Sequence, residues 1–208
     1  YRLESGSDML SEEGVRVNLP EEYNSFPITV LSVTDSTNTQ AKKLVMDKAP
    51  HGTMILAEEQ TAGRGRYGKS FFSPRGAGLY MSLILKPSLG MSDPQMITIA
   101  TAVSVCRAIE KLTNKKPQIK WVNDIYLDGK KICGILTEAV TDFESGNIES
   151  IVVGVGVDCT TEDSIIPDEL RGIMGSLGVK ELSRNRLAAE IAAGILRSFN
   201  NLGSCAII

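Results

Sequence analysis

The run at 78–86, Gly-Leu-Tyr-Met-Ser-Leu-Ile-Leu-Lys, constrains the fold most because it is almost continuously apolar. A strand with one face in water alternates apolar and polar residues, whereas a strand buried on both faces reads as an unbroken apolar run. The sequence therefore predicts a central strand at 78–86.

The other elements are predicted from hydrophobic periodicity and turn residues. Further strands are expected at 26–33, 53–58, 118–127, 131–138 and 148–157. Helices are expected around 41–46 and at 95–113 and 184–200, the last capped by Ser183. Asp128-Gly129 is a strong hairpin turn signal, and Asp158 ends the last strand. The predicted fold class is α+β, a mixed β-sheet flanked by helices.

Composition excludes several classes of protein. The chain has 208 residues, of which 42% are hydrophobic and 23% charged, as expected for one globular domain. A net charge of −3 argues against a nucleic-acid-binding body, because phosphate binding needs a concentrated excess of Lys and Arg. No apolar run approaches the roughly 18 residues of a membrane span, so we expect no membrane contact.

The cysteines and the single histidine indicate no metal site. The four cysteines are far apart and form no C-x-x-C pair, which excludes the usual zinc spacings and a small disulfide framework. They are interpreted as reduced residues of a cytoplasmic protein. His51 is the only histidine, so a histidine triad or multi-histidine site is not expected.

The segment 60–69 alternates glycines with cations: Gly63, Arg64, Gly65, Arg66, Gly68 and Lys69. Glycine permits close approach of the backbone to a ligand, so the pattern indicates an anion-holding loop. It is neither a dinucleotide fingerprint nor a Walker-type phosphate loop, because Ser-Phe-Phe-Ser-Pro follows it. A solvated basic turn is the alternative for this segment alone.

Two other polar groups stand out. Ser36, Thr37 and Asn38 precede a helix, where they either cap it or supply donors and acceptors for a small polar ligand. Lys120 lies between Ile119 and the only Trp of the chain. If 118–127 is one extended run, positions 120, 122 and 124 share a face. Lys120 then either faces water on an edge strand, where it aids solubility, or is partly shielded from water. Its apolar neighbours Ile119 and Trp121 favour the second interpretation.

Six motifs in this order resemble the biotin–protein ligase family over roughly residues 28 to 200. They are Asp-Ser-Thr-Asn at 35–38, Gln-Thr-Ala-Gly-Arg-Gly-Arg at 60–66, Phe-Phe-Ser-Pro at 71–74, Lys-Trp-Val-Asn-Asp at 120–124, Lys-Ile-Cys-Gly-Ile-Leu at 131–136 and Gly-Val-Gly-Val-Asp at 154–158. The resemblance implies a catalytic domain like that of biotin ligases and class II aminoacyl-tRNA synthetases.

The resemblance also implies a reaction, that of a biotin–[acetyl-CoA-carboxylase] ligase. Biotin's carboxylate attacks the α-phosphate of ATP, which gives biotinyl-5'-AMP and pyrophosphate. A specific lysine of a biotin carboxyl carrier protein domain then takes the biotin. ATP and biotin are substrates, and Mg²⁺ arrives with ATP. The site must hold two anions together and keep water off a reactive anhydride.

Site residues follow from the resemblance, motif by motif. The implied biotin-binding residues are Ser36, Thr37, Asn38, Gln60, Arg64, Gly65, Arg66 and Lys131. The implied ATP or adenylate-binding residues are Gly63, Arg66, Lys69, Phe71, Lys120, Asn123 and Asp158. The implied catalytic residues are Lys120, Arg66 and Lys131, with Lys120 the first choice for neutralising the α-phosphate. Asn123 and Asp124 are expected to orient the lysines or a magnesium-bound phosphate, or simply to form a turn.

Two residues depart from the family pattern. Val122 replaces a usual proline, which we expect to matter little because valine suits a strand. Asp158 stands where the family commonly has Asn. An amide pairs with both the N6 amino group and N7 of adenine, whereas a carboxylate only accepts. We expect Asp158 to accept from the amino group and a backbone N–H to serve N7.

The domain expectations are a linker or winged-helix remnant at 1–27, a catalytic domain at 28–208 and no C-terminal β-barrel domain. DNA binding, as in a biotin-responsive repressor, is expected only if a winged-helix domain precedes residue 1. Homodimerisation through sheet edges is expected from the family. Two alternatives remain: a lipoate or octanoyl ligase, whose Arg-Arg-x-x-Gly-Gly-Gly signature is absent, and a non-enzymatic biotinyl-adenylate sensor.

Overall fold

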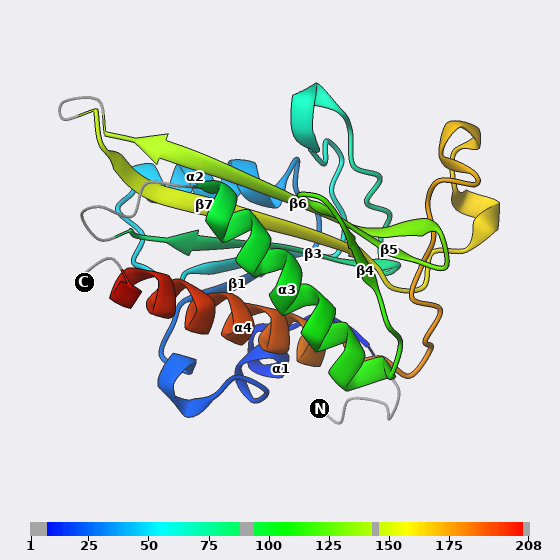
Figure 1. The fold of residues 1–208 in the computed structure, drawn as a ribbon, viewed down its shortest axis with the longest axis horizontal. Helices are drawn as coiled ribbons and strands as arrows, with labels where there is room; N and C mark the ends of the chain where they lie inside the picture. The colour runs from blue at the N-terminus through cyan, green and yellow to red at the C-terminus, as the bar shows by residue number, and fades with distance from the viewer. Residues whose placement is uncertain (1–7, 88–93, 143–145, 206–208) are drawn as a thin grey trace.

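The computed structural model describes residues 8–87, 94–142 and 146–205, and these form one mixed sheet with helices on both faces (Figure 1). The sheet order is β1-β2-β3-β7-β6-β5-β4. The strands are β1 Ile28–Leu31, β2 Met54–Ala57, β3 Gly78–Leu85, β4 Gln118–Lys120, β5 Asp124–Leu127, β6 Lys130–Thr141 and β7 Ile148–Asp158. The α-helices are α1 Glu12–Arg16, α2 Thr37–Met46, α3 Pro94–Thr113 and α4 Arg184–Cys205.

The predicted central strand is confirmed. β3 lies between β2 and β7, pairs antiparallel with both, and is buried at all of its residues. Only β1 and β2 pair in parallel among the described strands. The strands predicted at 26–33, 53–58 and 148–157 and the α+β class are likewise confirmed.

Different helices cover the two faces of the sheet. Leu79, Met81 and Leu83 of β3 belong to the main core, which α3 and α4 complete, and these two helices lie side by side across one face (Figure 1). On the opposite face, Ile84 packs with α2 in a smaller core: Ala41, Val45, Ile55, Ile84 and Val152. Because α2 is short, it leaves part of this face open for a polar site.

The predicted helices and turn are confirmed in detail. The hydroxyl of Ser183 accepts from the N–H of Arg186 and caps α4, whose expected inward residues are buried: Leu187, Ala188, Ile191, Ile195, Leu196 and Phe199. Asp128 and Gly129 take φ values of 51° and 77°, as a two-residue hairpin turn with positive φ at both positions requires.

The expectation of one extended run at 118–127 was wrong. The chain forms two short antiparallel strands, β4 and β5, with a turn at 121–123. Asn123 holds the turn against β6, because its amide donates to the Ile135 carbonyl at 3.3 Å and its own carbonyl accepts from the Ile135 N–H at 2.9 Å. Lys120 and Asp124 therefore share a face as a cross-strand pair and not as neighbours along one strand.

Residues 8–27 contribute to the core although no core-forming period predicts it. Leu10, Val15, Leu19 and Tyr23 are buried in the main core, and the Ser11 hydroxyl caps α1. The pattern was missed because a five-residue helix and a turn give no repeat long enough to detect. Of the linker or winged-helix remnant expected at 1–27, residues 1–7 lie outside the described residues, as do residues 206–208 of the expected catalytic domain.

An ion-pair cluster fixes this segment to the domain. The Arg184 side chain is 5% exposed and contacts Asp8 at 2.6 Å and Glu58 at 2.7 Å. Its guanidinium also donates to the Gly78 carbonyl at 3.1 Å. Hydrogen bonds to all these oxygens offset the cost of burying the charge, so the cluster joins the start of α4 to β3 and to the N-terminal segment.

Candidate functional site

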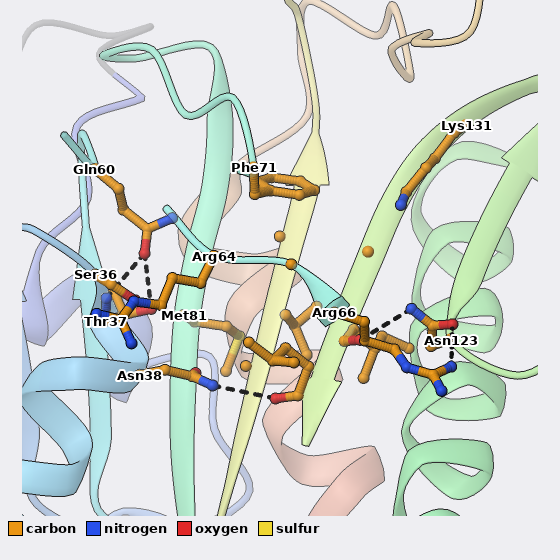
Figure 2. Close-up of a pocket in the computed structure, with 17 residues that line it drawn as sticks. Ser36, Thr37, Asn38, Gln60, Arg64, Arg66, Phe71, Met81, Asn123 and Lys131 are labelled. Atoms are coloured by element: carbon orange, nitrogen blue, oxygen red, sulfur yellow. Dashed lines mark hydrogen bonds between the residues drawn. The ribbon is translucent and has the colours of Figure 1, made fainter. Parts of the chain in front are cut away.

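A polar cleft lies on the α2 face of the sheet, and glycines of β6 and β7 form its floor (Figure 2). Gly154 and Gly156 have even positions on β7 and so point to this face, and Gly134 of β6 lies directly opposite Gly156. A Cβ at Gly154 would stand 2.2 Å from the Asn38 oxygen, and one at Gly156 would stand 2.5 Å from the Phe71 ring. The Gly-x-Gly spacing therefore lets two side chains lie flat on the sheet.

Asn38 is held in one orientation. Its amide nitrogen donates to Leu136 O at 3.2 Å and to the Glu138 carboxylate at 2.8 Å, and its oxygen accepts from Ser82 at 2.6 Å. Glu138 also pairs with Lys42 at 2.7 Å. Burial alone raises the pKa of Glu138, but the hydrogen bonds from Lys42 and Asn38 outweigh it and lower that pKa, so the carboxylate stays charged.

Hydroxyl protons in the cleft have defined directions. Because the Asn38 oxygen only accepts, Ser82 must donate to it, and Ser82 then accepts the Thr37 hydroxyl proton at 2.8 Å. Gln60 Oε1 lies 3.2 Å from the same hydroxyl and receives the Thr37 N–H at 2.9 Å (Figure 2). Thr37 therefore keeps a lone pair for a ligand N–H.

The Ser36 hydroxyl makes no hydrogen bond to any residue that the structure describes. Ser36 is the N-cap residue of α2, but its side chain makes no capping hydrogen bond. Its backbone N–H donates to the Asp35 carboxylate at 2.7 Å. Ser36 is 2% exposed and lines the cleft. The capping alternative for the Ser36 side chain is therefore not what the structure shows.

The glycine-cation loop folds as a small hairpin over the cleft. Gly65 N–H donates to Lys69 O at 2.7 Å and Phe71 N–H donates to Gly63 O at 2.9 Å. Gly63 is required because a Cβ there would stand 2.5 Å from the Phe71 carbonyl oxygen. Arg64 lines the cleft and makes no side-chain hydrogen bond or ion pair to the part of the chain that the structure describes.

A polar chain links Arg66 to Lys131 at the other end of the cleft. Arg66 donates to Asn123 Oδ1 at 2.9 Å, Asn123 donates to Asp124 at 3.2 Å, and Asp124 pairs with Lys131 at 2.6 Å. Figure 2 shows Arg66 and Asn123 pointing toward one another, and Lys131 lines the same cleft from β6. Two cations are thus held near one end of the cleft, where they can receive a carboxylate and a phosphate.

A second cavity adjoins the first and shares Phe71 and Lys131 with it. Asp158, at the end of β7, lines this cavity, whose walls are otherwise largely apolar: Ser70, Phe72, Leu170, Ile173 and Met174. The Phe71 ring packs edge-on against Tyr80 at a centroid distance of 6.5 Å. An apolar slot with one polar end suits a flat heterocycle.

The structure brings most expected site residues together. The residues that line the cleft are Ser36, Thr37, Asn38, Gln60, Arg64, Gly65, Arg66, Phe71, Asn123 and Lys131. Gly63 is part of the loop but does not itself line the cleft, and Asp158 lines the adjoining cavity.

Two expected residues are not at the cleft. Lys120 is exposed on the edge strand β4, where its ammonium lies 5.0 Å from the Tyr126 ring centroid and 3.4 Å from that hydroxyl. Partial shielding of this lysine was a wrong expectation, because the turn at 121–123 carries it to the edge and leaves Trp121 71% exposed. Lys69 is also exposed and lines neither cavity.

Sequence reasoning missed the residues that support the cleft. Ser82 is fully buried beneath Thr37 and Asn38, Ser73 accepts from Gln60 at 2.9 Å, and Glu138 fixes Asn38. The one available signal was a serine inside the apolar run at 78–86, since a buried hydroxyl needs a hydrogen-bond partner.

Glu138→Gln is expected to weaken binding of a ligand to the cleft by roughly fivefold. The exchange replaces the charge-assisted hydrogen bond from Asn38 by a neutral one and removes the ion pair with Lys42, which together cost about 1 kcal/mol. Calorimetric titration with biotin checks this. Glu149→Gln, which breaks the pair with Lys48 at the surface, is the matched control and should change affinity less than twofold. Equal affinities for Glu138→Gln and the parent chain would show that Asn38 needs no such support.

Two other features, a cluster of metal ligands and a membrane-spanning helix, are absent from the residues that the structure describes. Within residues 8–87, 94–142 and 146–205, no group of three or more His, Cys, Asp or Glu side chains is arranged to hold a metal ion. Among the same residues, no helix is long and apolar enough to cross a membrane.

The fold and the cleft define a domain of the class II aminoacyl-tRNA synthetase and biotin ligase type. The structure of biotin protein ligase from Aquifex aeolicus in complex with biotin and ATP is 26% identical and matches with a TM-score of 0.73 over 86% of this chain and 72% of that one. Residues 30–158, more than half of the chain, match the Biotin/lipoate A/B protein ligase family. The chain belongs to this family.

Individual relatives agree with this assignment. Bifunctional ligase/repressor BirA of Bacillus subtilis (strain 168) is 37% identical over 177 residues, which are 85% of this chain and 54% of that protein. The protein of the same name from Escherichia coli (strain K12) is 30% identical over 205 residues, 89% of this chain and 61% of that protein. The chain thus spans little more than half the length of these curated relatives.

Proposed function

We propose that this chain is the catalytic domain of a biotin–protein ligase that forms biotinyl-5'-AMP from biotin and ATP and transfers biotin to a lysine. The observation that carries the proposal is the pair of adjoining cavities with Phe71 and Lys131 between them. One cavity offers fixed hydrogen bonds to a small polar ring and the other an apolar slot. An acyl-adenylate has these two ends, with its carbonyl and phosphate between them.

The cleft has hydrogen-bonding groups that match the ureido ring of biotin. That ring has two N–H donors and one carbonyl acceptor. The free lone pair of Thr37 accepts from a ureido N–H, and the free hydroxyl of Ser36 donates to the carbonyl. Gln60 and Asn38 are satisfied by protein groups, so their main role is to keep the walls of the cleft rigid.

The cations act on the reacting groups. Arg64, Gly65 and Arg66 lie along the biotin carboxylate and the α-phosphate, and Lys131 binds the carboxylate or acyl oxygen. In the adenylation step the carboxylate oxygen attacks the α-phosphorus and pyrophosphate leaves, so negative charge accumulates on the phosphoryl oxygens. Arg66 and Lys131 are the proposed catalytic residues, and Lys120 is left out because of its exposed position.

Several wider properties belong to this proposal. Mg²⁺ arrives with ATP, the acceptor is a biotin carboxyl carrier protein domain, and the protein acts in the cytoplasm as a homodimer. Two relatives are named bifunctional ligase/repressor. DNA binding and repression are proposed here only for a longer chain with a winged-helix domain before residue 1.

Acceptor labelling tests the proposal against its rivals. The chain is incubated with MgATP, biotin and a purified biotin carboxyl carrier domain, and labelled lysine is detected by mass spectrometry. Labelling with biotin and not with lipoate or octanoate is expected. Labelling with lipoate would favour a lipoate ligase. Tight binding of biotinyl-adenylate without any labelling would favour the sensor.

A further inference from the structure

Tyr67 stands at the tip of the glycine-cation loop in a backbone conformation that tyrosine rarely adopts. Its φ and ψ are 56° and 35°, and Gly68 after it has a φ of 74°. The turn is closed by a hydrogen bond from Lys69 N–H to Arg66 O at 3.2 Å. Positive φ at both central residues is the geometry of a type I′ turn, whose first central position is usually Asn, Asp or Gly. A bulky side chain there is an outlier, so the turn itself does not explain a tyrosine.

Packing does not explain this tyrosine either. Tyr67 is 87% exposed and lines neither cavity of the candidate site. The polar and ring contacts that the structure describes for it are both with Arg66. Its hydroxyl accepts from Arg66 Nη2 at 2.9 Å, and its ring centroid lies 5.0 Å from the guanidinium carbon. The contact with Arg66 is therefore the feature of the structure that accounts for an aromatic phenol at a strained, exposed position.

Arg66 is held by uncharged groups on two sides. Its Nη1 donates to Asn123 Oδ1 at 2.9 Å, and its Nη2 donates to Tyr67. Two hydrogen bonds on different nitrogens fix the direction of the guanidinium plane, whereas one bond would let it rotate. Because neither acceptor carries a charge, the positive charge of Arg66 is not neutralised. A guanidinium has five N–H donors, so three remain for a ligand.

We propose that Tyr67 is a positioning residue, which holds the Arg66 guanidinium at the end of the cleft with its remaining N–H donors available to the α-phosphate. This inference rests on the proposed function, since it takes a phosphate as the partner of Arg66. Tyr67 does not contact the reacting atoms and acts through Arg66. An arginine that is already oriented loses less side-chain freedom when the phosphate arrives, which favours the transition state.

Tyr67→Phe removes the hydroxyl and keeps the ring, and exchange of labelled pyrophosphate into ATP measures kcat and the KM of biotin. Loss of one hydrogen bond that orients a charged group predicts a kcat about fivefold lower. The KM of biotin should change less than about twofold, because the ureido end of the cleft is untouched. Tyr126→Phe is the matched control, since the Tyr126 ring also lies 5.0 Å from a cation but outside the cleft. An equal fall of kcat in both variants would contradict the inference.

A double-mutant cycle tests whether the effect passes through Arg66. Arg66→Lys keeps the charge but has a single nitrogen, so it cannot bond Asn123 and Tyr67 through separate nitrogens. Single-turnover formation of biotinyl-5'-AMP measures even slow variants. In the Arg66→Lys background, Tyr67→Phe should slow the reaction less than about twofold, because coupled residues are not additive. A fivefold effect in both backgrounds would overturn the inference.

Tyr67→Gly separates positioning from stability. Glycine takes positive φ without strain, and this relief outweighs its extra freedom in the unfolded chain, so the variant should not unfold at a lower temperature than the parent. Its kcat should nevertheless fall roughly 15-fold, because the cation–π contact is lost together with the hydrogen bond. A merely structural role would lower both quantities. Parent-like kcat in Tyr67→Gly would overturn the inference.

An exposed aromatic at a loop tip also suits docking of a protein, and acceptor labelling distinguishes this role. If Tyr67→Phe leaves pyrophosphate exchange unchanged and raises only the KM of the acceptor domain, the inference fails while the proposed function stands. If the parent chain shows neither exchange nor labelling, the proposed function fails and the inference fails with it.

Discussion

Replacing Lys131 by alanine is expected to slow biotin-dependent adenylate formation by about 100- to 1000-fold, the loss that follows removal of one preorganised donor at a developing charge. The Lys131 ammonium is half-buried between the two cavities and is held by Asp124. Since the role proposed for the lysine is to bind the reacting carboxylate, the loss should appear mainly in kcat. Single-turnover measurement of biotinyl-5'-AMP from radiolabelled ATP checks it.

The chain offers two matched controls for this result. Lys130 is the preceding residue and is exposed at the start of β6, and Lys120 is exposed on β4. Alanine at either position should change the rate less than threefold. A large loss in Lys120→Ala with a small loss in Lys131→Ala would reverse the assignment of the two lysines.

Gly154→Ala is expected to weaken biotin binding by about 30- to 150-fold. The added Cβ would stand 2.2 Å from the Asn38 oxygen, so Asn38 must move away from Ser82 and Glu138. Overpacking of this kind costs about 2–3 kcal/mol, which corresponds to the stated change in affinity. Calorimetric titration with biotin measures the change, and circular dichroism reports whether the sheet remains folded.

Ser150→Ala on the same strand is the control for Gly154→Ala. Ser150 is fully buried, and its hydroxyl makes no hydrogen bond to any described residue. Its removal should leave biotin affinity unchanged. If Gly154→Ala binds biotin as tightly as the parent chain, Asn38 does not have to lie flat on β7 for binding.

The framework of the sheet was predictable because local signals and the global fold agree. The unbroken apolar run of β3 requires cover on both faces, and the Asp128-Gly129 turn requires positive φ at both residues, as observed. The end of β7 at Asp158 was also expected. These features depend on the residue itself and its nearest neighbours.

The course of residues 118–127 could not be predicted in the same way. Period-two reasoning assumes a continuous strand, but the turn at 121–123 is stabilised by Asn123 bonding to Ile135 on another strand. That contact depends on how β6 lies against the turn. The turn carries Lys120 to the edge strand, away from the cleft, whereas Lys131 on the long strand β6 lines it. The role expected for Lys120 therefore stays an untested prediction.

The candidate site was predictable from its motifs but not from its supports. Ser36, Thr37 and Gln60 lie in segments whose composition already indicates a polar function. Glu138 lies far from them along the chain and reaches Asn38 only because β6 and α2 meet on one face of the sheet. The unpaired carboxyl of Asp158 likewise became visible only once its surroundings were known.

Biotin-dependent exchange of labelled pyrophosphate into ATP, measured on this 208-residue chain with biotin and lipoate in parallel, tests the central claim most directly. The account predicts exchange with biotin, none with lipoate, and its near-complete loss in Lys131→Ala. Exchange with lipoate alone, or tight biotin binding without any exchange, would contradict the claim that these two adjoining cavities form an adenylate of biotin.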